Sequence, residues 1–308
     1  MPLGAHLPTS KGFQAALLHA QELGCDCLQI FSKSPRQWAG PPLDHEKAAA
    51  FRAAWKESGL WPLVVHDSYL INPAAPDPVM REKSIRAFID EVERADALGC
   101  DFLVTHCGAH LQKDCKAEAA GVLPVAEVAG LERLADSLRV VLERTPDARV
   151  RIALENTAAQ GTCLGGPFEH LAAVLNEVAS ERLCVCLDTC HAFAAGHDIS
   201  TAEGLEATIN DFDRLIGLDR LAIIHLNDSK AVLGQRVDRH DHIGQGHIGR
   251  AAMQRIVTHP RLKHLPFILE TPDLETMLET NLATVRNLRQ ENSELPPKGS
   301  MDGAGASE

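Results

Sequence analysis

Apolar runs along this chain end repeatedly on a side chain that can bind a metal ion. Six consecutive runs do so: LVV before His66, FLVT before His106, RIAL before Glu155, CVCL before Asp188, AII before His225 and FIL before Glu270. Imidazole nitrogen and carboxylate oxygen are the ligands that zinc and related divalent transition metals prefer. We therefore interpret the six residues as candidates for one shared metal site.

Three further candidates lie in the predicted loops. His191 lies one turn past Asp188 in LDTCHAFAAGHD, and Asp238 and His240 lie two residues apart in VDRH. In an extended segment, residues two positions apart have their side chains on the same side, which suits chelation of one ion. The nine candidates are five histidines and four carboxylates. They predict two or three ions, because a catalytic zinc takes about three protein ligands and keeps one position open.

The elements that would position these residues recur along the chain. Two more apolar runs, LGA before His6 and CLQI before Phe31, make eight, and the run ends are 25 to 49 residues apart. Each gap can hold one helix and two loops. Eight alternating strands and helices predict a (β/α)8 TIM barrel, whose active site lies at the C-terminal ends of the strands. A doubly wound open sheet is the alternative, but it would spread these strand ends along an edge.

Helix-start signals lie in the gaps between the runs. The candidate cap residues are Asp44, Asp77, Ser200 and Thr271. Asp77 and Thr271 each precede a proline, which is favoured in the first turn of a helix. Ser200 has a glutamate three residues later, which is the spacing of a capping box.

Length and composition favour one large domain. Barrels of this class use about 250 residues, so we expect one catalytic domain over residues 1–290 and a disordered acidic tail over 291–308. No run approaches the roughly 20 apolar residues needed to cross a bilayer, and the first residues lack the pattern of a secretion signal. We expect a cytoplasmic protein with no membrane partner. Nine cysteines, an odd number, predict reduced thiols.

Charge and glycine patterns bear on the possible ligands. A formal net charge of -12 argues against a generic polyanion binder, but a metal cluster would reverse the local sign by adding about two positive charges per ion. Gly244, Gly246 and Gly249 have the spacing of a dinucleotide fingerprint, yet they follow a polar loop instead of a strand. We expect no nucleotide cofactor. With no heptad or long apolar stripe, we expect a monomer.

Taken together, the motifs resemble those of endonuclease IV, the zinc-dependent apurinic/apyrimidinic (AP) endonucleases of base-excision repair. The resemblance spans roughly residues 3 to 290 and rests on HDSYLIN, LENTAAQG, LDTCHAFAAGHD, HLNDSK, VDRHDHIGQGHIG and ILET. Two stretches depart from the family pattern. HCGAH lacks the usual proline after His106, and HDS replaces Ala-Pro after His66. Both departures leave the histidine in place.

The resemblance implies a site of three Zn2+ ions per chain. His66, His106 and Glu155 would hold the first ion. Glu155 would bridge to the second, completed by Asp188, His225 and Glu270, and the remaining three residues would hold the third: His191, Asp238 and His240. Glu155 and Glu270 would be catalytic.

The implied reaction is hydrolysis of the phosphodiester 5' to an abasic site in duplex DNA, leaving a 3'-hydroxyl and a 5'-deoxyribose phosphate. Arg36, Tyr69 and Leu70 match the positions by which the family enters the minor groove and props open the lesion. Inserting such side chains costs base unstacking, and the cost is smallest where a base is missing. Lys33 and Lys230 are candidate phosphate contacts.

Two other functions compete with this interpretation. A metal-dependent sugar isomerase or epimerase could use the same barrel with one or two ions, but it has no evident use for His191, Asp238 and His240. A DNA-damage binding protein with a structural metal core and no catalysis is the other alternative. The presence of both Glu155 and Glu270 argues against it.

Overall fold

The chain closes into a barrel of parallel strands. The computed structural model describes residues 2–113 and 123–291. Strands adjacent in the sequence pair side by side, and the first strand pairs with the last to close the ring. The eight strands are β1 (Leu3–His6), β2 (Cys27–Phe31), β3 (Leu63–His66), β4 (Phe102–His106), β5 (Arg151–Glu155), β6 (Leu183–Asp188), β7 (Leu221–His225) and β10 (Phe267–Leu269). The predicted (β/α)8 barrel is confirmed, and the open sheet is excluded.

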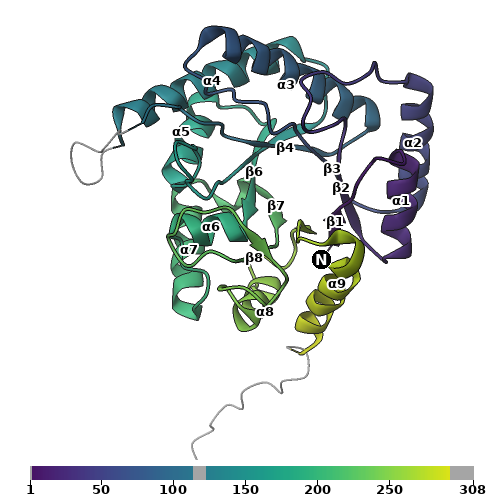
Figure 1. Cartoon of the computed structure of the whole chain (residues 1–308), viewed down its shortest axis with the longest axis vertical. Helices are drawn as coiled ribbons and strands as arrows, with labels where there is room; N and C mark the ends of the chain where they lie inside the picture. Colours follow the sequence, from purple (N-terminus) through teal and green to yellow (C-terminus); the bar gives the residue numbers. More distant parts are fainter. Residues whose placement is uncertain (1, 114–122, 292–308) are drawn as a thin grey trace, which may run out of the picture.

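Helices surround this barrel on the outside (Figure 1). They are α1 (Phe13–Glu22), α2 (His45–Ser58), α3 (Pro78–Leu98), α4 (Val125–Arg144), α5 (Phe168–Val178), α7 (Ala202–Leu215), α8 (Arg250–Thr258) and α9 (Leu274–Glu291). Three small elements were not predicted. A short helix, α6 (Thr189–Ala195), follows β6 directly, a 3-10 turn (Leu218–Arg220) precedes β7, and β8 (Asp228–Ser229) pairs with β9 (His240–Asp241) in an antiparallel hairpin.

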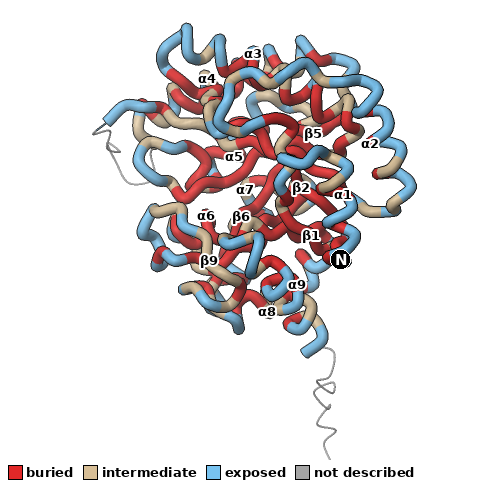
Figure 2. Tube along the Cα trace, turned by 45° about the vertical axis from the view of Figure 1, so that its right-hand side comes forward, coloured by how far each residue is buried: buried red, intermediate tan, exposed pale blue. Residues whose placement is uncertain are grey.

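The strands are buried on both faces, which explains their continuous apolar runs. Alternate residues separate into an inner cluster inside the barrel and an outer cluster under the helices. Cys184 and Cys186 both belong to the inner cluster, whereas Val185 between them belongs to the outer one. Burial is concentrated at the strands and exposure on the outer helix faces (Figure 2). No helix in the described ranges is long and apolar enough to cross a membrane.

Two of the four predicted helix caps are correct. The Asp44 carboxylate accepts from the backbone N–H groups of the first turn of α2, and Asp77 does the same for α3. The Ser200 assignment is wrong by one residue, because Thr201 caps α7 and accepts from Gly204. Thr271 is not a cap at all. Helix α9 begins only at Leu274, and the buried Thr271 hydroxyl accepts a hydrogen bond from Asn281.

The predicted tail, residues 291–308, lies outside the described residues except for Glu291, which is the last residue of α9.

Closure of the barrel depends on a missing side chain in β1. A Cβ atom on Gly4 would lie 2.0 Å from the backbone carbonyl oxygen of Cys27 on β2. The Cys27 carbonyl is held in the β-sheet and cannot move away from this clash as a flexible side chain could. We therefore expect Gly4→Ala to lower the free energy of unfolding by about 3 kcal/mol, the upper end of the usual range for overpacking. Urea denaturation followed by circular dichroism measures this loss.

Gly161→Ala is the control for this prediction. Gly161 has a left-handed backbone with a φ of 62° and no atom within 4 Å of the added Cβ. Its replacement should cost about 1 kcal/mol through backbone strain alone. Equal losses in the two variants would contradict the steric explanation.

Candidate metal centre

The six strand-end residues converge on one rim of the barrel. His66, His106, Glu155, Asp188 and His225 are the last residues of β3 to β7, and Glu270 directly follows β10. Because all eight strands are parallel, their C-terminal ends meet at the same rim. The side chains point toward a common centre above the barrel core.

Helix α6 places His191 on this rim. The Asp188 carboxylate is the N-cap of α6 and accepts a hydrogen bond of 2.7 Å from the His191 backbone N–H. The sequence interpretation put His191 in a loop, but it lies in the first turn of this helix. One aspartate therefore both faces the candidate site and fixes the direction of the helix that carries a further candidate ligand.

The β8–β9 hairpin brings Asp238 and His240 to the rim. Asp228 on β8 is fully buried, and its carboxylate accepts from the backbone N–H groups of Gly244, Ile248 and Gly249. A Cβ on Gly246 would lie 2.5 Å from the Ser229 carbonyl oxygen. The glycines that imitate a dinucleotide motif thus serve to wrap this loop around Asp228.

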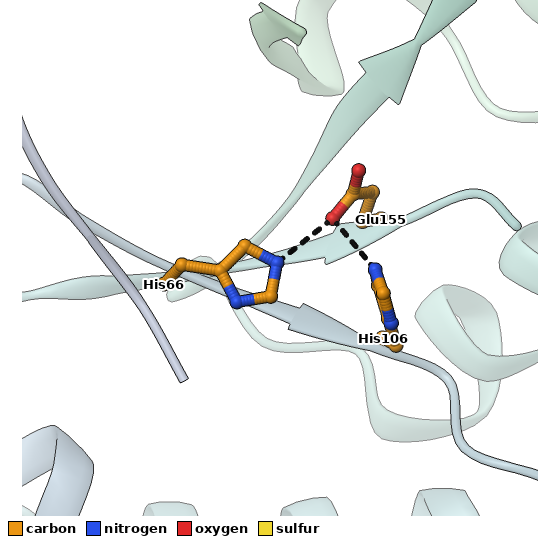
Figure 3. Close-up of side chains that lie close together, drawn as sticks. All are labelled: His66, His106 and Glu155. Carbon is orange, nitrogen blue, oxygen red and sulfur yellow. Dashed lines mark hydrogen bonds and ion pairs between the residues drawn. The ribbon is translucent and has the colours of Figure 1, made fainter. Parts of the chain in front are cut away.

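Glu155 lies at the centre of the site, with its two carboxylate oxygens facing different histidines. Oε2 lies 3.2 Å from His66 Nε2 and 3.1 Å from His106 Nε2 (Figure 3). Oε1 lies 2.9 Å from His225 Nδ1, which is in turn 3.2 Å from Glu270 Oε2. This arrangement is suited to a carboxylate that bridges two metal ions.

Within the described residues, all nine predicted ligands fall into compact groups of possible donors. In each group one donor atom per residue lies within 4.8 Å of the others. The groups built only from histidine and carboxylate are His66, His106 and Glu155; Glu155, Asp188, His225 and Glu270; and His191, Asp238 and His240. These are the three sets that the resemblance implies.

Two thiols also lie close to the candidate ligands. Cys186 falls near Glu155 and His225, and Cys190 falls near Asp188 and His240. Burial raises the pKa of each thiol to about 12. A protonated thiol is a weak ligand, so the imidazole and carboxylate donors are the better set. The described cysteines are all unpaired.

Hydrogen bonds from outside the centre orient three of the imidazole rings. The Nδ1 atoms of His66, His191 and His240 lie 2.9 to 3.0 Å from backbone carbonyl oxygens. Each ring therefore donates from Nδ1 and directs Nε2 inward, so that the lone pair of the neutral ring faces the centre, as in metal-binding histidines. His240 Nε2 is buried and has no hydrogen-bond partner among the described residues. Such an orphan nitrogen is rare, and a bound cation would satisfy it.

The packed charges shift the pKa values in opposite directions. Burial alone would raise the pKa of Glu155, but His225 and His106 outweigh it and hold the pKa well below the ordinary range. Burial would raise the pKa of Asp238, but its hydrogen bond with His191 and the charges of the neighbouring histidines together lower it to about 2. Burial opposes charge on His66, yet Glu155 raises its pKa to about 9. The carboxylates are thus anionic and require neighbouring positive charge.

A pocket of about 320 Å³ opens above this centre. Tyr69 lines this pocket, and 63% of its surface is exposed. Its ring packs edge-on against that of Phe31, with the two ring centroids 5.5 Å apart. Arg36, in the loop after β2, is exposed, and Leu70, in the loop after β3, is half-buried. All three follow strand ends on the rim that carries the candidate ligands.

The prediction that Lys33 contacts phosphate is wrong. Its side chain is buried, and Nζ lies 2.6 Å from Asp90 and 3.0 Å from Glu91. Lys33 is paired with these two carboxylates of α3, so its ammonium group does not face the candidate site. Lys230, by contrast, is exposed after β8.

The two loops that contain the departures from the family pattern pack against each other. The Asn72 side chain accepts from the Ala109 N–H at 2.9 Å and donates to the Ala109 carbonyl at 3.0 Å. Gly108, with a φ of 76°, lies so close to Asn72 that a Cβ would be 2.3 Å from its Oδ1. The HCGAH and HDSYLIN loops therefore hold one another, and His66 and His106 stay at the rim.

Comparison with known proteins identifies the family. Residues 17–288 match the family model described as a xylose isomerase-like TIM barrel. A probable endonuclease 4 of Chloroflexus aurantiacus is 47% identical over 290 residues, covering 93% of this chain and 98% of the relative. A probable endonuclease 4 of Geobacter sulfurreducens is 41% identical, covering 93% and 94%.

The chain belongs to the endonuclease 4 family. The crystal structure of endonuclease IV from Thermus thermophilus superposes with a TM-score of 0.81 at 37% identity, covering 94% of this chain and all of that one. A D-tagatose 3-epimerase-like protein has a TM-score of 0.66 at 18% identity. That second likeness shows a shared barrel and no more.

For a member of the endonuclease 4 family with this centre, metal binding should depend on pH. In the metal-free protein His66 has a pKa of about 9, raised from 6.5, so it carries a proton at neutral pH. A metal requires the neutral ring, so binding must release that proton. We expect zinc affinity to rise about tenfold per pH unit for each released proton between pH 6.5 and 9.

Isothermal titration with zinc in buffers of different ionisation enthalpy counts the released protons. A zinc affinity that does not change over this pH range would contradict the assignment of the buried histidines as ligands.

Proposed function

We propose that this protein is a DNA-repair endonuclease that hydrolyses the phosphodiester 5' to abasic sites in duplex DNA through three zinc ions. The observation that supports this proposal most directly is the two-sided environment of Glu155, with a separate third donor group beside it. Family membership supports the same activity. The products would be a 3'-hydroxyl and a 5'-deoxyribose phosphate.

The residues of the three groups would have separate tasks. His66 and His106 would hold one ion on the Oε2 side of Glu155, and Asp188, His225 and Glu270 would hold a second on the Oε1 side. His191, Asp238 and His240 would hold the third. Zinc supplies Lewis acidity at such a site, which lowers the pKa of water and neutralises phosphate charge. Glu155 would keep two ions at a fixed separation.

The buried surroundings would keep this centre rigid. Glu155, Asp188 and His225 are fully buried, and the backbone carbonyl contacts orient His66, His191 and His240 before any substrate arrives. Preorganised groups need no rearrangement during the reaction, which is a large part of enzymatic rate enhancement. The open pocket leaves the outer side free for a phosphodiester.

Recognition of the lesion would depend on the exposed rim residues. Tyr69 projects from the loop after β3, and Arg36 and Leu70 lie on rim loops of neighbouring strands. Placing these side chains in the base stack costs least where a base is already absent. Three bound ions would add about six positive charges and so attract DNA to a chain whose net charge is -12.

A duplex carrying one tetrahydrofuran residue tests the activity. This abasic analogue has no aldehyde and cannot be cleaved by β-elimination, so a cut requires hydrolysis. We expect the zinc-loaded protein to cut on the 5' side of the analogue and leave a 3'-hydroxyl. Glu155→Gln should lower the rate by at least about 1000-fold, because the bridging charge is lost.

Glu57→Gln is the control, since it removes the same charge from an exposed site near the C-terminal end of α2, which leads to the end of β3 opposite the rim. It should cut at the unmodified rate. An uncut strand under zinc-replete conditions, with the unmodified protein, would overturn the proposed function.

Tyr69→Ala tests lesion recognition separately from chemistry. Loss of the exposed ring should weaken binding to the tetrahydrofuran duplex by about 1–3 kcal/mol, the usual worth of an aromatic contact with a base. Binding to an intact duplex should change far less. Fluorescence anisotropy with both duplexes measures the difference.

Trp61 offers a matched control for Tyr69. It is an aromatic residue with 51% of its surface exposed, but it precedes β3 and so lies at the opposite end of the same strand. Trp61→Ala should leave both affinities unchanged. A Tyr69→Ala variant that weakened both duplexes equally would contradict a role in recognising the lesion.

A further inference from the structure

Gln29 is a buried amide inside the barrel that the sequence interpretation did not single out. It lies in the middle of β2 with no exposed surface. Its Oε1 is 2.8 Å from His225 Nε2, and its Nε2 is 2.6 Å from Glu270 Oε1. One side chain thus contacts two of the candidate ligands of the second metal group. A polar residue in the apolar run CLQI was the available signal.

The short contact with Glu270 determines which way the amide points. A carboxylate oxygen only accepts hydrogen bonds, so the group 2.6 Å away must be the NH2 end of Gln29. The reversed amide would set two acceptor oxygens against each other in a buried site. The carbonyl end therefore faces His225, and it can only accept.

This orientation of the amide in turn determines the protonation pattern of His225. Nε2 must carry the proton that it donates to Gln29 Oε1. The neutral ring then has its lone pair on Nδ1, which lies 2.9 Å from Glu155 Oε1 and 3.2 Å from Glu270 Oε2. The nitrogen that faces the carboxylates is the one free to bind a metal. The same contact also occupies Oε1 of Glu270 and leaves Oε2 for the site.

We propose that Gln29 is a positioning residue that selects Nδ1 of His225 and Oε2 of Glu270 as the ligating atoms of the second metal group. This inference rests on the proposed function, because it needs a metal at that group. Hydrogen-bond partners of ligand side chains commonly change metal affinity by about 10–100-fold when they are removed. The Gln29 amide nitrogen also lies 3.0 Å from His6 Nδ1, so the amide connects residues of β1, β2 and β7 with the residue that follows β10.

Gln29→Met tests this role, since it removes both hydrogen-bonding ends and keeps a side chain of similar length. We expect one of three zinc ions to be lost to a chelator at a concentration about 10–100-fold lower than in the unmodified protein. The ion at His191, Asp238 and His240 serves as an internal reference and should keep its affinity, because Gln29 does not contact that group.

Cys184→Ala is the control for loss of a buried side chain inside the barrel. Cys184 is fully buried in the inner cluster and donates to the Ile152 carbonyl, away from the ligands. It should retain all three ions at unmodified affinity. Equal zinc affinities in Gln29→Met and the unmodified protein would overturn the inference and leave the proposed function standing. An unmodified protein that binds no zinc would overturn both.

A second measurement needs no variant. Long-range proton–nitrogen NMR spectra of the zinc-loaded protein distinguish the protonated ring nitrogen of an assigned histidine. We expect His225 to carry its proton on Nε2. A proton on Nδ1 would overturn the inference even if Gln29→Met failed to fold.

Discussion

A buried carboxylate that needs positive charge on both of its oxygens governs this structure. Glu155 has no exposed surface, and an isolated anion in that position would cost several kcal/mol. His66 and His106 approach one oxygen and His225 approaches the other. Burial favours the neutral acid, but the histidines prevail and hold the pKa of Glu155 well below its usual value. Divalent cations at the same two positions would meet this demand better than protonated rings.

The barrel is what makes such a concentration of groups possible. Parallel strands deliver their last residues to one rim, and the inner cluster of alternate residues fills the space beneath them. The third donor group depends on additions to the plain barrel. Helix α6 carries His191, and the β8–β9 hairpin, closed around Asp228, carries His240.

Strand ends were predictable because doubly buried strands are continuous apolar runs that stop where the polar rim begins. Seven of the eight observed strand ends, from His6 to His225, coincide with the predicted ones, and β10 ends one residue early, at Leu269. Features set by tertiary contacts were not predictable. Lys33 was expected to contact phosphate, but it is buried against two carboxylates of α3, of which Asp90 lies 57 residues further along the chain.

Tertiary contacts also explain why the Thr271 cap was predicted wrongly and why the role of Gln29 was not predicted. Thr271 has the local pattern of a cap, yet Asn281 uses its hydroxyl and α9 begins later. The proposed role of Gln29 depends on its hydrogen bonds with His225 and Glu270, which lie 196 and 241 residues further along the chain. Local spacing identifies which residues can bind a metal, whereas the groups that orient them come from distant strands.

The most direct test of the bridging role of Glu155 is anomalous diffraction at the zinc edge from crystals grown with zinc. We expect three peaks per chain, with one oxygen of Glu155 next to each of two peaks and His191, Asp238 and His240 around the third. A single peak, or two peaks without a Glu155 oxygen between them, would contradict the bridging role.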